Sequence, residues 1–286
     1  MKRFNPIIIL FLLMALSNGQ KRDPRAVAMA GAYTTIADGI YSVGYNPALI
    51  AFQIDRPFML QVGGIDFDFG NNYFSMAAMR AISGDTLNQD DKSLIINRLD
   101  HRGGLNFDMN FQVATPGLNY SSGNMAITSN ILYMSSYSLP AGIVRLMLEG
   151  NANNPVIDMT LGYEIMAVHE LGYSFAVPFE SFALGFSLKY LQGLFYMGID
   201  PDSSSANFIT TPQAVYGSGN YYLRQGFGGA GYGLDIGVAT KEINGMRFGV
   251  SVINAIGTIG WNKPSFIKDI MKYPLKWGGE SLSDSV

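Results

Sequence analysis

Apolar and small or polar residues alternate along most of the chain after Phe58, and this two-residue period restricts its fold more than any other feature. In residues 106–113 the odd positions are Phe, Met, Phe and Val, whereas the even positions are Asn, Asp, Asn and Gln. The same alternation occurs in 181–190, 231–238 and 245–252. Successive side chains of a strand point to opposite faces, so each run predicts a strand with one apolar face. A longer run, 161–177, fits either two strands joined by a tight turn or one long strand.

The face opposite the apolar one decides between two classes of β protein, because strands of a soluble sandwich alternate in the same way. That face carries Gly, Ser, Ala and Asn with an occasional single charge. Charged residues make up 14% of the chain, against about 25% in a typical soluble domain. A lipid-facing apolar band opposite a small, polar lumen explains both faces. We therefore expect an all-β fold, an antiparallel transmembrane β-barrel, closed or open, with about eight to ten strands of roughly ten residues each.

Several function classes are disfavoured by composition and motif spacing. A net charge of −3 with 19 Lys and Arg leaves no basic excess, so no nucleic-acid partner is expected. The chain has no Cys, and its two histidines, His101 and His169, are far apart in the sequence. The glycine-rich string 226–231 leads into a strand pattern, not into the helix that a dinucleotide site needs. We expect no metal, no cofactor and no enzymatic activity.

The first residues have the composition of a secretory signal peptide. A basic start and an apolar run over 7–16 precede the small residues Ser17 and Gly19, which favours cleavage after residue 19. The alternative for residues 1–19 is a buried N-terminal helix. No later stretch reaches the ~18 consecutive apolar residues that predict a transmembrane helix. Export combined with the barrel pattern predicts the outer membrane of a Gram-negative-type cell.

Three stretches interrupt the strand pattern. Residues 83–98 predict a polar loop with a short helical piece, and 201–220, rich in Ser, Asn, Gly and Thr, predicts a long extracellular loop. Residues 140–150 predict a helix, with Pro140 in the first turn and Gly150 at the stop. An amphiphile needs an apolar surface before it enters a cavity. The candidate ligand-binding residues are therefore the apolar ones of this helix: Ile143, Val144, Leu146 and Met147.

Residues 25–48 read RAVAMAGAYTTIADGIYSVGYNPA. This segment resembles the N-terminus of FadL-type outer-membrane transport proteins and their PorV-like relatives, in which a similar segment ending in YNPA precedes the first strand. The resemblance implies an N-terminal plug over residues 20–57 and a barrel over 58–286. The positions that match the motif are Gly31, Asp38, Asn46, Pro47 and Ala48.

The resemblance implies two kinds of function. The transport branch moves long-chain fatty acids or other hydrophobic compounds, and the PorV branch acts as a secretion-system partner. We expect passive transport of a hydrophobic small molecule such as a fatty acid, with outer-membrane lipid around the barrel. The alternatives are a role with secretion-system proteins or in cell-surface attachment, and a structural outer-membrane protein. Barrels of the family have more strands than this chain supplies, and 272–286 lacks clean alternation, so we expect a C-terminally incomplete or reduced member.

Overall fold

The computed structural model describes residues 23–54, 57–75, 87–152, 154–200, 202–262 and 275–278. The expected signal peptide, 1–19, lies outside these ranges. Strands dominate the described chain and pair in antiparallel fashion, which confirms the expected all-β class.

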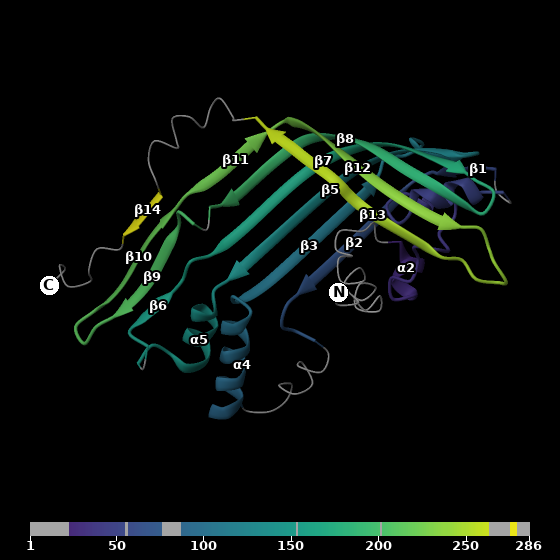
Figure 1. Ribbon diagram of the computed structural model, residues 1–286. Helices are drawn as coiled ribbons and strands as arrows, with labels where there is room; N and C mark the ends of the chain where they lie inside the picture. Colours follow the sequence, from purple (N-terminus) through teal and green to yellow (C-terminus); the bar gives the residue numbers. More distant parts are fainter. Residues whose placement is uncertain are drawn as a thin grey trace, which may run out of the picture.

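The largest unit is a ten-stranded sheet (Figure 1). Its strands are β1 (Phe58–Gln61), β2 (Gly64–Asn71), β3 (Leu105–Ala114), β4 (Asn119–Ser122), β5 (Met125–Leu139), β7 (Gly162–Pro178), β8 (Phe182–Ile199), β11 (Leu223–Phe227), β12 (Gly229–Thr240) and β13 (Gly249–Trp261). Three positions in the sheet are each occupied by two successive strands, end to end: β1 with β2, β3 with β4, and β11 with β12. Counted by position, the strands therefore pair in chain order, as an up-and-down meander.

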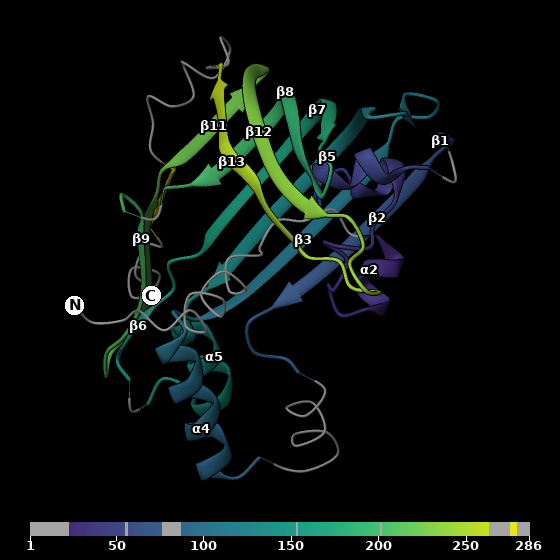
Figure 2. The ribbon, with the colours of Figure 1, turned by 45° about the vertical axis from the view of Figure 1, so that its right-hand side comes forward.

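The sheet is curved but not closed in the described residues. One edge is the β1–β2 row and the other is β13, and no pairing joins them among the described strands. Figure 2 shows β12 and β13 curving over the face on which α2 lies. The described strands therefore form an open, antiparallel sheet, and the expected barrel stays a prediction. The 161–177 run forms the single 17-residue strand β7, so the one-strand alternative for this run is confirmed.

The connections at the two ends of the sheet differ in length. At one end, β2 and β3 are joined through α4 (Gln89–His101), and β5 and β7 through α5 (Ala141–Glu149) and β6 (Val156–Asp158). At the same end, the hairpin of β9 (Ser205–Thr210) and β10 (Val215–Tyr221) joins β8 to β11. At the other end the links are short turns, such as 179–181 between β7 and β8.

Two segments expected as irregular contain strands. The expected loop 201–220 forms the β9–β10 hairpin, in which Ile209 pairs with Tyr216 across the strands. In the tail, β14 (Leu275–Gly278) pairs with β10, so β6, β9, β10 and β14 make a second, four-stranded sheet. Ser, Thr and Asn are compatible with strands when partners are available, and composition alone does not reveal those partners.

The helical piece expected within 83–98 is longer than expected, because α4 runs for 13 residues from Gln89 to His101. Its start is a capping box, in which the Asn88 side chain accepts from the Asp91 backbone and the Asp91 side chain accepts from the Asn88 backbone. This arrangement satisfies backbone donors that a helix leaves unpaired at its first turn. Asp90 and Asp91 therefore lie in the first turn of a helix.

The glycine string 226–231 lies at a break between two strands. β11 ends at Phe227 and β12 begins at Gly229, with Gly228 at φ +69° and Gly229 at φ +149°. These are conformations that residues with a Cβ rarely adopt. The string allows a bend in the sheet and is followed by a strand, as the sequence indicates.

Residues 23–54, called here the N-terminal segment, contain α2 (Pro24–Ala28) and the 3₁₀ helices η1 (Gly39–Ser42) and η2 (Pro47–Phe52). The η2 helix packs against β7, β8 and β12 near the end with the short turns. The inward side of these strands, called here the wall, carries small residues beneath η2. Buried apolar residues join the two parts in two clusters: Tyr33, Tyr45, Ala48 and Leu49 with Ala183 and Ala239, and Ile40, Val43 and Ile50 with Ala126 and Ala176.

Candidate functional site

The two faces of the main sheet differ in chemistry. One face, called here the outward face, presents large apolar side chains to the surroundings. Its exposed members include Ile65, Phe67, Phe69, Phe111, Ile131, Leu171, Tyr173, Leu188, Tyr190, Tyr232, Val238, Val250 and Val252. The opposite, inward face carries Gly, Ala and Ser, together with a few charged and amide side chains, and it is the face covered in part by the N-terminal segment. The inward face therefore holds the candidate site.

Asn46, Pro47 and Ala48 attach the N-terminal segment to the sheet. Asn46 is fully buried, and its Oδ1 accepts a hydrogen bond from the Ala48 backbone N–H at 3.1 Å, which caps η2. Its Nδ2 donates to the carbonyl oxygen of Thr34 at 3.2 Å and to that of Val238, in β12, at 3.0 Å. One side chain thus holds its own turn, the preceding turn and the wall together.

The wall has glycines where these three residues approach it. A Cβ on Gly185 of β8 would overlap the backbone of Pro47 and Ala48. A Cβ on Gly237 of β12 would overlap the Asn46 side chain. Glycine at these two positions lets the N-terminal segment come close to the strand backbone.

The other two motif positions, Gly31 and Asp38, lie in turns of the N-terminal segment. Gly31 is exposed, has φ +84° and ends the turn that follows α2. Asp38 precedes η1 as its N-cap, although its side chain makes no capping hydrogen bond. The structure therefore places Asn46, Pro47 and Ala48 against the wall and leaves Gly31 and Asp38 in the turns that lead there.

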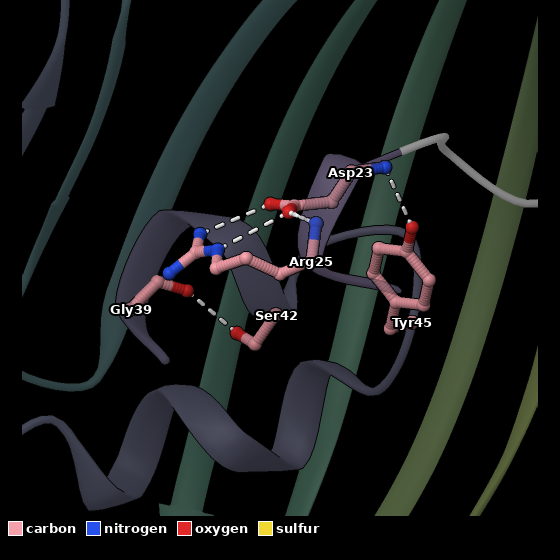
Figure 3. A network of polar contacts seen from close by, with 5 residues as sticks. All are labelled: Asp23, Arg25, Gly39, Ser42 and Tyr45. Atoms are coloured by element: carbon pink, nitrogen blue, oxygen red, sulfur yellow. Dashed lines mark hydrogen bonds and ion pairs between the residues drawn. The ribbon is translucent and has the colours of Figure 1, made fainter. Parts of the chain in front are cut away.

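A polar network ties the start of the N-terminal segment to Tyr45, just before η2 (Figure 3). The Asp23 backbone N–H donates to the Tyr45 hydroxyl at 2.9 Å, and the Arg25 guanidinium makes an ion pair with the Asp23 carboxylate at 3.0 Å. The Arg25 guanidinium also lies 4.0 Å from the centre of the Tyr41 ring. These contacts make the segment a compact unit, since they link residues up to 22 positions apart.

Tyr33 lies inside this unit, with its ring edge-on to that of Tyr45 at 5.0 Å. Burial, with a further contribution from the nearby Asp23 carboxylate, raises the pKa of the Tyr33 phenol to about 12. Burial disfavours the charged phenolate, and a neighbouring negative charge has the same effect.

A buried charged cluster spans four adjacent strands on the inward face. Lys189 of β8 lies 2.8 Å from the Asp235 carboxylate of β12 and 3.7 Å from that of Glu170 in β7. Lys189 also donates to Asn254 Oδ1 in β13 at 3.1 Å, and the Asn254 backbone N–H donates to Asp235 at 2.7 Å. Asp235 is fully buried and Lys189 is 8% exposed, so the pair is shielded from water.

A cavity of about 250 Å³ lies between this cluster and the N-terminal segment. Val43 and Gly44 of the N-terminal segment form one side of the cavity. Its polar lining comes from both edges of the sheet and from the strands between them: Asp66, Asp68, Asn110, Gln112, Asn130, Glu170, Lys189 and Asn254. Because β2 and β13 both contribute, the curvature of the sheet brings its two edges to one cavity.

The residues expected to bind a hydrophobic ligand lie elsewhere. Ile143, Val144, Leu146 and Met147 belong to α5, at the end with the long connections. Val144 packs against the buried cluster that α4 and α5 share, whereas Met147 is 80% exposed. None of the four lines the cavity. The four residues thus lie together on α5, apart from the cavity, and their role in ligand binding stays a prediction.

Sequence reasoning missed the charged cluster as a site. The one visible signal was a single charge within a Gly- and Ser-rich alternating face, which occurs at Lys189 and Asp235. The two residues are 46 positions apart, and their contact depends on the pairing of β8 with β12.

In the described part of the chain, no helix combines the length and the apolar character needed to span a membrane. Among these residues, no group of three or more His, Cys, Asp or Glu side chains is arranged to hold a metal ion. His169 lies with its Nε2 2.9 Å from Ser129 Oγ, and His101 ends α4.

Fold and site define a class: an antiparallel, meandering sheet with an apolar outward face and a compact N-terminal segment docked on its polar inward face. The chain belongs to a family of unknown function, DUF5723, whose model matches residues 47–224. The match begins in the Asn46-Pro47-Ala48 contact and extends through η2 to the start of β11. No curated protein and no solved structure matched the chain.

Proposed function

We propose that this protein is an outer-membrane β-barrel component that passes small molecules passively, with the N-terminal segment as its plug. The observation that carries the proposal is the exposed apolar outward face opposite a polar inward face. Soluble proteins rarely expose continuous apolar surfaces of this kind. A barrel strand in a membrane alternates in the same sense, with apolar side chains toward lipid and polar ones toward the lumen.

The two ends of the sheet support an orientation. Outer-membrane barrels have short periplasmic turns and longer extracellular loops. By this rule α4, α5 and the β9–β10 hairpin lie outside the cell, and the N-terminal segment lies near the periplasmic end. The resemblance of residues 25–48 to FadL-type and PorV-like proteins supports the same assignment of this segment as a plug.

The transported class expected from the resemblance is hydrophobic, with fatty acids as the example. Met147 of α5 offers an exposed apolar landing point for such a ligand. The cavity next to the N-terminal segment has a different lining, dominated by carboxylate and amide groups. Its chemistry favours a polar solute at this position along the path.

The membrane location is tested by placing arginine at two depths of β8. Leu188 is 53% exposed on the outward face, six residues above Phe182 at the short-turn end. Six residues of a strand tilted by about 45° rise roughly 14 Å, which is near the middle of the ~25 Å apolar band. Leu188→Arg should therefore destabilise the inserted protein by about 2–4 kcal/mol, and Phe182→Arg by about 0–1 kcal/mol.

The measurement is urea unfolding in lipid vesicles, followed by heat-modifiable gel migration. Equal effects of the two arginines, or a monodisperse protein without detergent, would contradict the membrane location. Transport is measured separately by the swelling of proteoliposomes in isosmotic solutions of small solutes. A protein that inserts but leaves swelling at the level of empty liposomes would contradict the transport role and favour the role of a partner in secretion.

A further inference from the structure

We infer that Lys189 and Asn254 form an isopeptide bond, a covalent amide between their side chains that ties β8 to β13 and releases ammonia. Such a bond is a modification of the chain itself, and it requires neither a membrane location nor transport. Three observations carry it: the contact of the two side chains, a buried carboxylate beside them and the backbone that brings them together. The structure shows the two side chains before the reaction, as separate groups.

The amine and the amide that react are already in contact. Lys189 Nζ lies 3.1 Å from Asn254 Oδ1. A C=O bond is about 1.2 Å long, so the Asn254 Cγ carbon, the atom that the amine attacks, lies within roughly 4.3 Å of Nζ. The two residues are 65 positions apart, and the fold holds them together. Well-oriented groups of one molecule reach effective molarities on the order of 10⁵–10⁸ M, which offsets the low reactivity of an amide.

Asp235 supplies the base that the amine needs. Its Oδ2 lies 2.8 Å from Lys189 Nζ and accepts no hydrogen bond from any other group that the structure describes. Its Oδ1 accepts the Asn254 backbone N–H at 2.7 Å, which fixes the carboxylate beside the amide. Asp235 is fully buried and Lys189 is 8% exposed. Burial disfavours both charges of an ion pair, and transfer of one proton from the ammonium to the carboxylate leaves two neutral groups and an amine with a free lone pair.

The backbone is shaped around this contact. The register of β12 against β13 shifts at Asp235, which marks a β-bulge. On the facing strand Asn254 has φ +53°, a left-handed conformation that Asn adopts more readily than most residues. Gly233 of β12 lies beneath the Lys189 stem, since a Cβ there would be 3.4 Å from Cβ and Cδ of Lys189. The Lys189 side chain can therefore cross β12 and reach β13, which is not adjacent to β8 in the sheet.

Atoms and protons balance without a co-reactant. The Lys189 ammonium gives one proton to Asp235 Oδ2, and the lone pair of Nζ then bonds to Asn254 Cγ while the C=O π pair moves to Oδ1. That pair returns as the Cγ–Nδ2 bond breaks, and the leaving nitrogen takes a second Nζ proton, relayed by Asp235, to depart as ammonia. The third proton remains on the new amide, and Asp235 ends as a neutral acid. The cavity that Lys189 and Asn254 line receives the ammonia.

The choice of Asn254 follows from the groups around the amine. Glu170 is the other carboxylate nearby, 3.7 Å from Nζ. The negative charge of an ionised carboxylate repels a lone pair, whereas the amide carbon of Asn254 is neutral. The bond fastens the edge of the sheet, because β12 is the one partner of β13 among the described strands and the new amide adds β8 as a second.

The experiment measures the intact mass of the full chain, first unfolded in denaturant and then after refolding, with circular dichroism to verify the β structure. We expect the unfolded chain to keep the full mass of its sequence and the refolded chain to lose the mass of one ammonia. Tryptic digestion of the refolded chain should then give a branched peptide that joins Lys189 to Asn254, without cleavage after Lys189.

Two variants remove one reacting group each. Lys189→Arg keeps a positive charge beside Asp235 but lacks the amine, and Lys241→Arg, in the exposed turn after β12, is its matched control. Asn254→Ala lacks the reacting carbon, and Asn130→Ala, another amide of the same cavity lining, is its control. We expect both test variants to keep the full mass after refolding and both controls to lose one ammonia. Asp235→Asn keeps both reacting groups without the base, so the rate of ammonia loss should fall about 10²-fold.

A refolded wild-type chain that keeps its full mass overturns the inference. Loss of one water, with Lys189 joined to a carboxylate, also overturns it, because Asn254 is then not the partner. Loss of ammonia without the branched peptide, as a succinimide at Asn244 and Gly245 would give, does the same. None of these outcomes bears on the proposed transport, since insertion and liposome swelling are measured separately.

Discussion

The side-chain amide of Asn46 donates a hydrogen bond to the backbone carbonyl of Val238, which lies 192 positions further along the chain, at 3.0 Å. Two further contacts join the same parts: Ser251 Oγ donates to the Tyr45 carbonyl oxygen, and Arg247 donates to that of Thr35 at 3.3 Å. The N-terminal segment is thereby bound to β12, to β13 and to the turn before β13. A change at Asn46 therefore tests whether this segment can be released while the sheet stays folded.

Asn46→Ala removes both donated bonds and the cap on Ala48. Asn46→Asp keeps an oxygen for the Ala48 N–H but loses the donors to Thr34 and Val238. We expect both variants to loosen the N-terminal segment, by about 2–3 kcal/mol, because both lose the hydrogen bonds that Asn46 donates to the carbonyl oxygens of Thr34 and Val238. Limited proteolysis near Tyr45 measures the loosening, and heat-modifiable migration should stay unchanged. Wild-type protease resistance in Asn46→Asp would show that the cap alone holds the segment.

Gly185→Ala places a methyl group where the backbone of Pro47 and Ala48 lies. Because the group it meets is backbone, the N-terminal segment has to move away, and we expect faster proteolysis of residues 23–54 and greater solute leakage into proteoliposomes. Gly257→Ala in β13 is the control, since its added methyl would meet only ordinary contacts. Equal protease sensitivity of the two variants would contradict the docking of Pro47 and Ala48 on β8.

Lys189→Met leaves the Asp235 carboxylate buried without its cation. We expect a loss of about 3–5 kcal/mol in the free energy of unfolding, because an uncompensated buried charge is strongly destabilising. Adding Asp235→Asn should recover part of this loss, since the neutral amide no longer needs a cation. Urea unfolding followed by tryptophan fluorescence measures both. Losses that simply add in the double variant would mean that the two side chains do not interact energetically.

The Tyr33 phenol should stay protonated at a pH where exposed tyrosines ionise. Burial and the Asp23 carboxylate raise its pKa to about 12, above the ordinary value of 10.0. A raised folded-state pKa means that the contribution of Tyr33 to stability is complete below pH 10 and is lost as the pH rises through about 12. The difference in absorbance at about 295 nm between the wild type and Tyr33→Phe should titrate with a midpoint near 12. A midpoint near 10 would show that Tyr33 is accessible to water.

The sequence by itself determined the strands and the class of fold. Alternation over 106–113, 181–190 and 231–238 specifies strands with one apolar face, because the side-chain period of a strand is a local property of its backbone. Asn46 before Pro47 likewise specified a turn, since proline restricts the residue before it and Asn can bond the backbone two residues on. The structure shows that bond, from Ala48 to Asn46 Oδ1.

Only the tertiary structure decided which residues meet. The pairing of β8 with β12 brings Lys189 to Asp235, and the curvature of the sheet brings Asp66 and Asn254 to one cavity. The hairpin at 205–221 and the length of α4 also exceeded what local composition indicated. The apolar run of α5 likewise divides, since Val144 packs against a buried cluster and Met147 is exposed. The physical reason is common to all these cases: periodicity records which face a side chain takes, whereas register, curvature and docking depend on partners that are distant in the chain.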